Sequence, residues 1–346
     1  MAVSIGIIPH TDKKAVAEMD ALLEKEGIRR DRNLDYSCGV FDEEGALIAT
    51  GSCFGSTLRC FAVDSSHRGE GLVNLLLSHL TEYQLQRGNT HIFLYTKKKN
   101  SRIFSDLGFY EIASVGEALT FMENRKNGFS RYLKELQRTR QDGTAAAIIM
   151  NANPFTKGHR HLVQAASEGN ASVHIFLLSE EAGPIPFGVR KQLVQRGIAD
   201  LPNVILHDSG PYLISSATFP SYFLPDEDSA IEAQAKLDLA IFTRIAGTLS
   251  ISVRYVGQEP FSHVTMMYNQ ILAEGLPKVG IEFREVPRIS AGEQIISASA
   301  VRQAIHDGDI ASVSPMLPAS TLSYFQSKEA LPVIDALKSS DSVRHY

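Results

Sequence analysis

The chain has 346 residues and carries 34 Lys and Arg side chains against 39 Asp and Glu side chains, so its formal net charge is −5. At about 150 residues per domain, this length predicts two domains. No segment approaches the roughly 18 consecutive apolar residues that a membrane helix needs, and the first residues lack the basic patch and apolar run of a secretory signal. We therefore expect a cytoplasmic protein without a membrane partner, and the slight negative charge argues against nucleic-acid binding.

The first part of the chain has the pattern of an α+β domain. Apolar runs typical of strands surround one periodic helix from about Leu72 to Arg87, in which leucines recur at helical spacing. Cys38, Cys53 and Cys60 have neither CxxC spacing nor a neighbouring histidine cluster, so we expect reduced, buried thiols rather than a zinc or redox site. The runs typical of strands are Val40–Phe41, Ala46–Thr50, Leu58–Val63 and His91–Tyr95.

A glycine-containing turn, RGEGLV, joins the third of these runs to the helix. Its Arg68, Gly69 and Gly71 resemble the acyl-CoA-binding turn of the GNAT family of N-acetyltransferases, R/Q-x-x-G-x-G/A. The resemblance implies that backbone amides of the turn cradle the pyrophosphate of a CoA-like group. Val73 departs from the pattern, because Gly or Ala is usual there. A retained fold with a silent or repurposed pocket is therefore the alternative.

A polar segment divides the chain into two expected domains. Residues 128–143 favour helix and have a glycine at each end, so we expect a linking helix there, with an acetyltransferase-like domain at residues 1–127 and a second domain at residues 144–346. In the second domain, buried strands alternate with helices, which predicts a parallel, doubly wound, Rossmann-like α/β sheet. The expected strands are Ala145–Met150, Val173–Leu178, Val204–Leu206, Val253–Val256 and Ile281–Val286, and the expected helices are Arg160–Ser167, Arg190–Gly197, Ala230–Ala246 and Ala300–His306.

The segment NANPFTKGH follows the first strand of the second domain and opens a helix. Ligands of open α/β sheets bind at the carboxyl ends of strands, and a helix start offers N–H groups to a phosphate. Thr156 and His159 resemble the T-x-G-H signature of the nucleotidyltransferase superfamily, which implies that they contact ATP phosphates. The alternative is a histidine satisfied by the backbone at the helix start. The other residues that we expect around ATP in this loop are Asn151, Asn153, Pro154, Phe155 and Gly158.

A second motif, ISASAVR, follows the last expected strand. It is similar to the I-S-x-S/T-x-x-R signature of the same superfamily, which implies that Ser297 and Ser299 bind ATP and that Arg302 points a guanidinium at its phosphates. The alternative is a serine that only caps the helix. Gly257 and Glu259 end another strand, where adenine or ribose could approach and the carboxylate could bind a hydroxyl or support Mg²⁺. We expect His159→Ala to abolish adenylation without loss of the fold, because this helix start should be exposed.

Four blocks, MNANPFTKGHRHLV, ATFPSYF, RYVGQEPF and ISASAVRQ, together resemble the citrate lyase ligase family in content and order. The resemblance implies that acetate is adenylated by ATP with release of pyrophosphate. It also implies transfer of the acetyl group to the thiol of the phosphoribosyl-dephospho-CoA group on the citrate lyase acyl carrier subunit. The second block, around Phe219, could equally serve packing alone.

Three other functions compete with this interpretation. An adenylyltransferase of the pantetheine-phosphate or nicotinamide-nucleotide type would share both nucleotide motifs, but it needs no acetyltransferase-like domain. An acetyl-CoA-dependent N-acetyltransferase would use the first domain, but Val73 disfavours it. A non-catalytic ATP sensor would not need all of Thr156, His159, Ser299 and Arg302.

Overall fold

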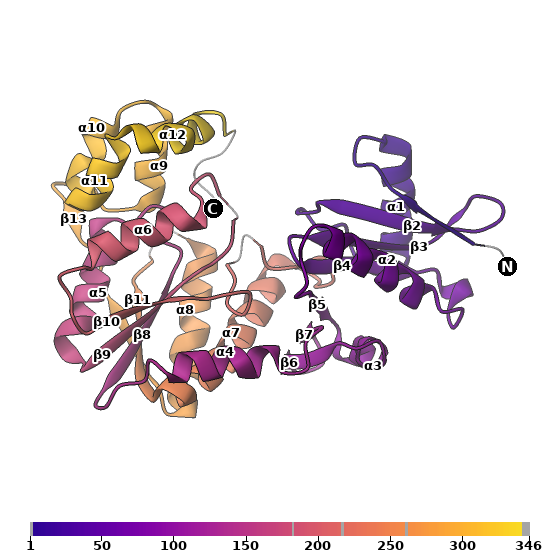
Figure 1. Ribbon diagram of the computed structural model, residues 1–346, viewed down its shortest axis with the longest axis horizontal. Coiled ribbons are helices and arrows are strands. Elements are labelled where there is room, and N and C mark those ends of the chain that lie inside the picture. Colours follow the sequence, from indigo (N-terminus) through magenta and orange to yellow (C-terminus); the bar gives the residue numbers. More distant parts are fainter. Residues whose placement is uncertain (1–2, 182, 216–217, 260–261, 341–346) are drawn as a thin grey trace. The chain divides into compact units, whose positions relative to one another are not determined.

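The computed structural model describes residues 3–181, 183–215, 218–259 and 262–340, which form two compact units (Figure 1). The first unit comprises the chain up to Arg131 together with Pro220–Ala240, and the second comprises Tyr132–Phe219 together with the chain from Ile241 onward. Helix α4 (Gly128–Gln137) occupies the segment expected to link the domains. Two separate segments of the chain therefore form the first unit, whereas we expected from the sequence that each domain is continuous.

The first unit is built on a seven-stranded sheet with the order β1-β2-β3-β4-β5-β7-β6. Its neighbouring strands are antiparallel, except that β4 and β5 are parallel and pair only at Thr57 with Phe93 and at Leu58 with Leu94. The ladder between β4 and β5 therefore ends early, and the backbone groups of the remaining part of β4 do not pair with β5. The strands are β1 (Ser4–Ile7), β2 (Tyr36–Phe41), β3 (Leu47–Phe54), β4 (Thr57–Val63), β5 (Phe93–Thr96), β6 (Tyr110–Val115) and β7 (Leu119–Glu123).

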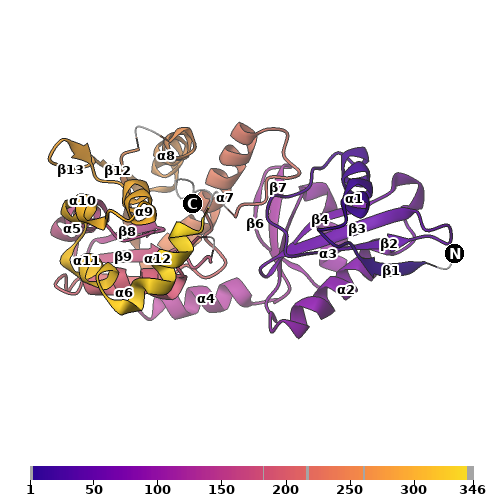
Figure 2. The same ribbon diagram turned by 90° about the horizontal axis from the view of Figure 1, so that it is seen from above.

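Helices cover both faces of this sheet: α1 (Lys13–Lys25) lies on one face and α2 (Leu72–Gln86) on the other, while α3 (Ser101–Asp106) precedes β6 (Figure 2). Leu72, Leu76 and Leu80 of α2 are buried in one core with Cys38 and Cys53, as the helical spacing of the leucines predicts. All three cysteines are buried and free, so the expectation of reduced thiols is confirmed.

The aromatic block that follows Phe219 packs into the first unit. Tyr222 and Phe223 are each 7% exposed, and the backbone carbonyl of Tyr222 accepts a hydrogen bond of 2.9 Å from the Arg29 N–H. Arg29 Nη2 also donates to the Leu224 carbonyl at 2.9 Å. These contacts favour the packing interpretation for Tyr222 and Phe223, while Ala217 of the same block lies outside the described residues.

The second unit is built on a five-stranded, wholly parallel sheet with the order β10-β9-β8-β11-β12. The chain moves outward from β8 first in one direction and then in the other, so β8 lies at the topological switch point where such sheets bind ligands. The expected doubly wound, Rossmann-like sheet is confirmed. The strands are β8 (Ala145–Met150), β9 (Ser172–Leu177), β10 (Val204–Asp208), β11 (Ile251–Gly257) and β12 (Glu282–Val286), with a short hairpin of β13 (Ser290–Ala291) and β14 (Gln294–Ile295).

Alternate side chains of β8, β9 and β11 share one core with helices α5, α6 and α9–α12. On the other face of the sheet, the Arg254 guanidinium lies 4.6 Å from the ring centroid of Phe242 in α7. No helix in the described parts of the chain is long and apolar enough to cross a membrane. The helices are α5 (Lys157–Gly169), α6 (Phe187–Gly197), α7 (Glu227–Leu249), α8 (His263–Gly275), α9 (Ala298–His306), α10 (Ile310–Val313), α11 (Ala319–Phe325) and α12 (Leu331–Lys338).

Two buried histidines on β9 and β10 predict that the second unit is less stable at acid pH. His174 and His207 share a hydrogen bond of 2.9 Å, and burial lowers the pKa of each imidazole to about 4. An unfolded histidine has a pKa of about 6.5, so the unfolded chain binds protons more tightly. The stability that this difference contributes is full above about pH 6.5 and is lost as the pH falls toward 4.

We expect the free energy of unfolding to drop by about 3 kcal/mol for each imidazole across this window, or about 6 kcal/mol for the pair, because one pKa unit corresponds to about 1.4 kcal/mol. The double variant His174→Leu/His207→Leu should flatten the dependence, since it removes both partners of the hydrogen bond together. Urea unfolding at several pH values measures the effect. The variant His10→Gln, which changes an exposed histidine, serves as the control. If the free energy of unfolding of the double variant falls with pH as steeply as that of the wild type, the pair does not take up protons on unfolding.

Candidate active site

The loop after β8 ends in a hydrogen-bonded cap at the start of α5. Thr156 is the N-cap: its Oγ1 accepts from the His159 backbone N–H at 3.4 Å, and its own backbone N–H donates to His159 Nδ1 at 3.1 Å. This is a capping box with histidine in the position that Glu or Gln usually takes. Since Nδ1 accepts a backbone proton, the neutral imidazole carries its own proton on Nε2.

Burial, followed by the positive charges of Arg288 and Arg302, lowers the pKa of His159 to about 4. The imidazole is therefore neutral near pH 7 and offers Nε2–H as a hydrogen-bond donor. The histidine is mostly buried rather than at an exposed helix start, so the expectation of an exposed position was wrong. Its ring stacks against Phe155 at 5.8 Å between centroids, which is why the side chain is partly withdrawn from solvent.

The second motif lies directly against the first. Arg302 of α9 is 2% exposed, and its Nη1 donates to the Asn153 carbonyl at 2.6 Å. A Cβ added to Gly158 would lie 3.6 Å from Ile296 Cγ2, so the starts of α5 and α9 are neighbours. Ser297 is the N-cap of α9 and accepts from the Ala300 N–H at 3.1 Å, as the capping alternative predicts. The second residue of that helix, Ser299, is half-buried.

The middle of the loop is packed into the core. Phe155 is fully buried, and its carbonyl accepts from Thr321 Oγ1 at 3.0 Å, so a contact with a nucleotide would have to come from its backbone. Pro154 is buried as well. Asn153 is 5% exposed, and its Oδ1 has no hydrogen-bond partner among the described residues. An acceptor in that position can take an O–H or N–H group of a ligand.

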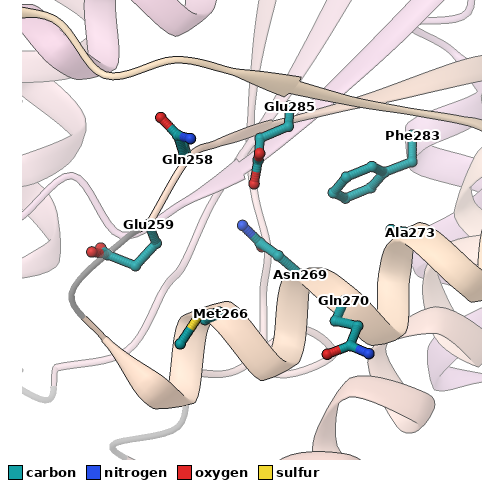
Figure 3. Close-up of a pocket in the computed structure, with 8 residues that line it drawn as sticks. All are labelled: Gln258, Glu259, Met266, Asn269, Gln270, Ala273, Phe283 and Glu285. Atoms are coloured by element: carbon teal, nitrogen blue, oxygen red, sulfur yellow. The ribbon is translucent and has the colours of Figure 1, made fainter.

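The carboxyl end of β11 adds an ion pair and a pocket. Glu259 pairs with Arg288, whose Nε also donates to the Gln258 carbonyl at 2.7 Å. The carbonyl of Gly257 accepts from Asn269 Nδ2 at 3.2 Å. A pocket of about 360 Å³ opens beside Glu259, between α8 and the edge strand β12 (Figure 3). It is lined by Gln258, Glu259, Met266, Asn269, Gln270, Ala273, Phe283 and Glu285.

Sequence reasoning missed two arginines of this site. Arg288 lies two residues beyond the carboxyl end of β12, where a basic residue soon after a strand is a usable signal. Arg190 of α6 is buried and donates to Asn151, but nothing in its local pattern separates it from an ordinary surface arginine. The loop after β8 is thus bonded by Arg190 of α6, Arg302 of α9 and Thr321 of α11, while Arg288 reaches Glu259.

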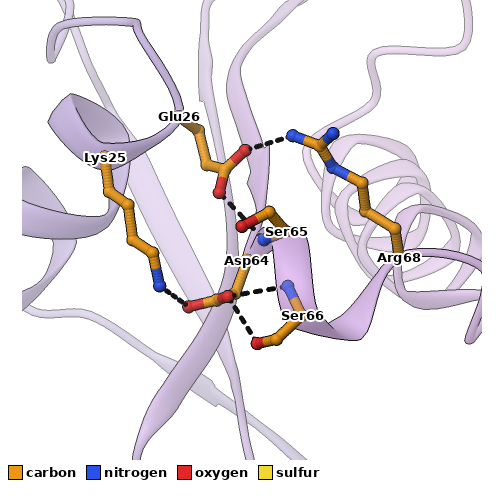
Figure 4. Close-up of polar contacts among 6 residues, drawn as sticks. All are labelled: Lys25, Glu26, Asp64, Ser65, Ser66 and Arg68. Carbon is orange, nitrogen blue, oxygen red and sulfur yellow. Dashed lines mark hydrogen bonds and ion pairs between the residues drawn. The ribbon is translucent and has the colours of Figure 1, made fainter.

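The turn expected to bind a CoA-like group lies in the first unit. Gly69 and Gly71 have φ values of 89° and 78°, a conformation that favours glycine, and α2 begins directly after Gly71. Arg68 Nη2 pairs with Glu26 Oε2 at 2.6 Å, and Lys25 pairs with Asp64 at 2.7 Å (Figure 4). The end of α1 therefore holds the turn in place. The structure gathers the residues of the turn in the first unit and those of the two nucleotide motifs in the second.

These features define a two-part α/β protein, with an acetyltransferase-like first unit and a Rossmann-like second unit that carries ligand-binding motifs at its switch point. The family model "Citrate lyase ligase C-terminal domain" matches residues 145–325, and the model "Acetyltransferase (GNAT) family" matches residues 10–110. The chain belongs to the citrate lyase ligase family.

Three curated relatives support this assignment, and all are citrate (pro-3S)-lyase ligases. The Escherichia coli protein is 36% identical over 92% of this chain and 92% of its own length. The Klebsiella pneumoniae protein is 35% identical over 90% of this chain and 93% of its own length. The Haemophilus influenzae protein is 32% identical over 91% of this chain and 96% of its own length. Among solved structures, a GNAT acetyltransferase from Staphylococcus aureus is 14% identical over 35% of this chain and 98% of its own, with a TM-score of 0.30.

Proposed function

We propose that this protein activates citrate lyase by acetylating it in an ATP-dependent ligase reaction. The support is the name shared by the three relatives, each aligned over at least nine-tenths of both chains. The proposed acceptor is the thiol of the CoA-like prosthetic group on the acyl carrier subunit of the lyase, and the proposed acyl donor is acetate. Because ATP and acetate are metabolites of the cytoplasm, we propose that the enzyme acts there, without a membrane or nucleic-acid partner.

The proposed reaction has two steps. A carboxylate oxygen of acetate attacks the α-phosphorus of ATP, a new P–O bond forms, and the bond to the β-phosphate oxygen breaks so that pyrophosphate leaves. The thiolate then attacks the acyl carbon of acetyl-adenylate, which forms the thioester and releases AMP. Neither step needs a covalent bond to the protein, so positioning and charge stabilisation supply the catalysis.

The observation that carries this proposal is the junction of the two motifs at the switch point. Thr156 and His159 cap α5, and Arg302 reaches the same loop through the Asn153 carbonyl. We propose that His159 Nε2–H, the free amides at the start of α5 and the charges of Arg302 and Arg288 stabilise the developing negative charge on pyrophosphate. Mg²⁺ would neutralise part of the triphosphate charge and would be held largely by the phosphates themselves.

We propose that the nucleoside lies near Gly257 and Glu259. Gly257 offers space at its Cα, since an added Cβ would meet no atom of the described residues within 4 Å, and the pocket beside Glu259 has amide groups and apolar side chains. Glu259 is held by Arg288, so its carboxylate is oriented to accept from a ribose hydroxyl. Ser297 would contribute to ATP binding through the capped start of α9, and Ser299 through its hydroxyl.

Acetate-dependent exchange of labelled pyrophosphate into ATP, with Mg²⁺ and without carrier protein or CoA, tests the first step by itself. Exchange that requires acetate supports carboxylate adenylation. Exchange stimulated by phosphopantetheine and not by acetate would instead identify a cofactor adenylyltransferase. Acetyl-CoA consumption without ATP would favour an N-acetyltransferase.

The first unit is proposed to dock the CoA-like arm of the carrier. Two features support this: the glycine turn at the start of α2, and the early end of the β4–β5 ladder, which leaves backbone groups of β4 unpaired by β5. Backbone amides at a helix start are suited to a pyrophosphate.

We expect Arg68→Ala to raise the KM for the carrier by about tenfold, the effect of one lost charged contact, while pyrophosphate exchange stays at the wild-type rate. Gly71→Ala should raise the KM by a similar factor, because alanine is strained at a φ of 78° and would shift the turn. The same assay on Arg102→Ala, an exposed position on α3, should give wild-type values. Unchanged KM and turnover with the carrier in both turn variants would rule out this docking role.

A further inference from the structure

Arg190 of α6 is a buried cation whose hydrogen bonds all go to uncharged oxygens. Its side chain is 2% exposed, and its donors reach four backbone carbonyls and one amide oxygen. The acceptors are the carbonyls of Asn151 (2.8 Å), Leu178 (2.9 Å), Ile185 (3.2 Å) and Glu180, and the side-chain Oδ1 of Asn151 (2.8 Å). Burial lowers the pKa of this guanidinium below its ordinary value, which shows that its charge is poorly solvated.

The carboxylates closest to this charge are already used. Glu180 accepts from Ser215 Oγ at 2.8 Å and from Thr218 Oγ1 at 2.5 Å. Glu181 accepts from the Phe187 N–H at 3.0 Å, and both carboxylates act on Arg190 only through space. A buried charge without a directly bonded counterion is costly, so its retention needs a compensating role.

The position of the acceptors indicates that role. Asn151 directly follows β8 and Leu178 directly follows β9, so one guanidinium joins the carboxyl ends of two neighbouring strands at the switch point. The same group fixes the orientation of the Asn151 side chain. An arginine only donates, so the amide must present its oxygen to Arg190 and direct its two Nδ2 hydrogens elsewhere.

The donor end of Asn151 is not used within the described part of the chain. Asn151 is half-buried, its Nδ2 makes no hydrogen bond with the described residues, and the side chain lies in the loop that ends at Thr156. An oriented N–H pair with a buried positive charge behind it is suited to an anionic oxygen. Two groups with such oxygens take part in the proposed reaction: the nucleotide α-phosphate and the acetate carboxylate.

We propose that Arg190 is a positioning residue that acts through Asn151, aiming the Asn151 amide at an anionic oxygen of the reacting groups and adding a buried positive charge behind it. This proposal rests on the proposed function for the identity of the anion. The coupling between Arg190 and Asn151 does not depend on the proposed function, because ligand binding alone can report it.

The test is a double-mutant cycle in the full chain with Arg190→Met, Asn151→Ala and the combination. The readouts are kcat and KM for ATP and for acetate in pyrophosphate exchange, measured well below the thermal midpoint of each variant. Arg190→Lys tests rescue by a charge without the planar fork. Arg196→Met, an exposed arginine on the same helix, is the matched control.

We expect each single variant to lower kcat/KM by about 10- to 100-fold, with the double variant no worse than the poorer single one, and Arg190→Lys to recover part of the loss. A loss confined to the KM for ATP assigns the anion to the nucleotide, and a loss confined to the KM for acetate assigns it to the acid. Wild-type kinetics in Arg190→Met, or losses that multiply in the double variant, would overturn the proposal. If the wild type catalyses no exchange, the proposed function fails, and the cycle is measured instead on the ATP-induced rise in thermal midpoint.

Discussion

Replacing His159 with alanine is expected to slow acetate-dependent pyrophosphate exchange by about 10²- to 10³-fold, the typical effect of removing one donor from a charge-stabilising site. The neutral imidazole has its Nδ1 occupied by the Thr156 N–H, so Nε2–H is the group available to the leaving pyrophosphate. Alanine also removes half of the capping box, which should cost about 1 kcal/mol of stability. Exchange kinetics and thermal unfolding measured on the same preparation separate the two effects.

His159→Gln is the matched control for this experiment. Glutamine is a usual partner of threonine in a capping box, so this variant should restore the thermal midpoint because Oε1 can accept from the Thr156 N–H. We expect it to remain at least about tenfold slower than wild type, since the flexible amide does not hold a donor in the place of Nε2–H. Exchange at the wild-type rate by His159→Ala would exclude the imidazole from the site.

Replacing Arg302 with methionine is expected to reduce exchange by a similar factor, about 10²- to 10³-fold. Two effects combine: a positive charge near His159 is lost, and the Asn153 carbonyl loses its donor at 2.6 Å. Because the carbonyl is part of the loop between β8 and α5, the loss should raise the KM for ATP as well as lower kcat. Steady-state exchange at varied ATP concentrations measures both constants.

Two further variants make the Arg302 result interpretable. Arg302→Lys keeps the charge but loses the planar fork, so we expect it to recover only part of the rate. Gln303→Met changes the next residue of α9 and should leave both constants near wild type. If Arg302→Met unfolds no earlier than wild type and still exchanges normally, the second motif serves only to cap α9.

The removal of Arg302 should also change His159 itself. The Arg302 charge is one cause of the low pKa of the imidazole, after burial and the charge of Arg288. In Arg302→Met the pKa of His159 is therefore expected to rise toward its ordinary value of about 6.5. Histidine NMR titration of the ligand-free variant checks this, and an unchanged titration would show that the Arg302 charge does not contribute to the low pKa of His159.

Local patterns predicted most elements of the second unit. The run Ala145–Met150 is the strand β8 without change, and the expected helix at Ala300–His306 is α9 with two more residues at its start. These segments combine an apolar period with a clear cap, which are properties of neighbouring residues. The short helices α10–α12 were not predicted, because their apolar residues gain meaning only from the core that they share with β8 and β9.

Long-range packing decided what local patterns could not. The backbone of Arg29 binds that of Tyr222, nearly two hundred positions away, and this contact places the aromatic block in the first unit. In the candidate site, Arg190 and Arg288 were missed for the same reason. Each is an unremarkable arginine in its own segment, and only the fold brings it to the loop after β8 or to Glu259.

The sequence by itself determined the family, the Rossmann-like alternation and the two motifs, because these depend on residue order and on local spacing. Only the tertiary structure decided the state of the groups in the site. His159 is a neutral donor, Asn151 is held by its oxygen, and Ser297 is a helix cap. Protonation and hydrogen-bond direction depend on burial and on charges from distant segments, which become defined only when those segments pack together.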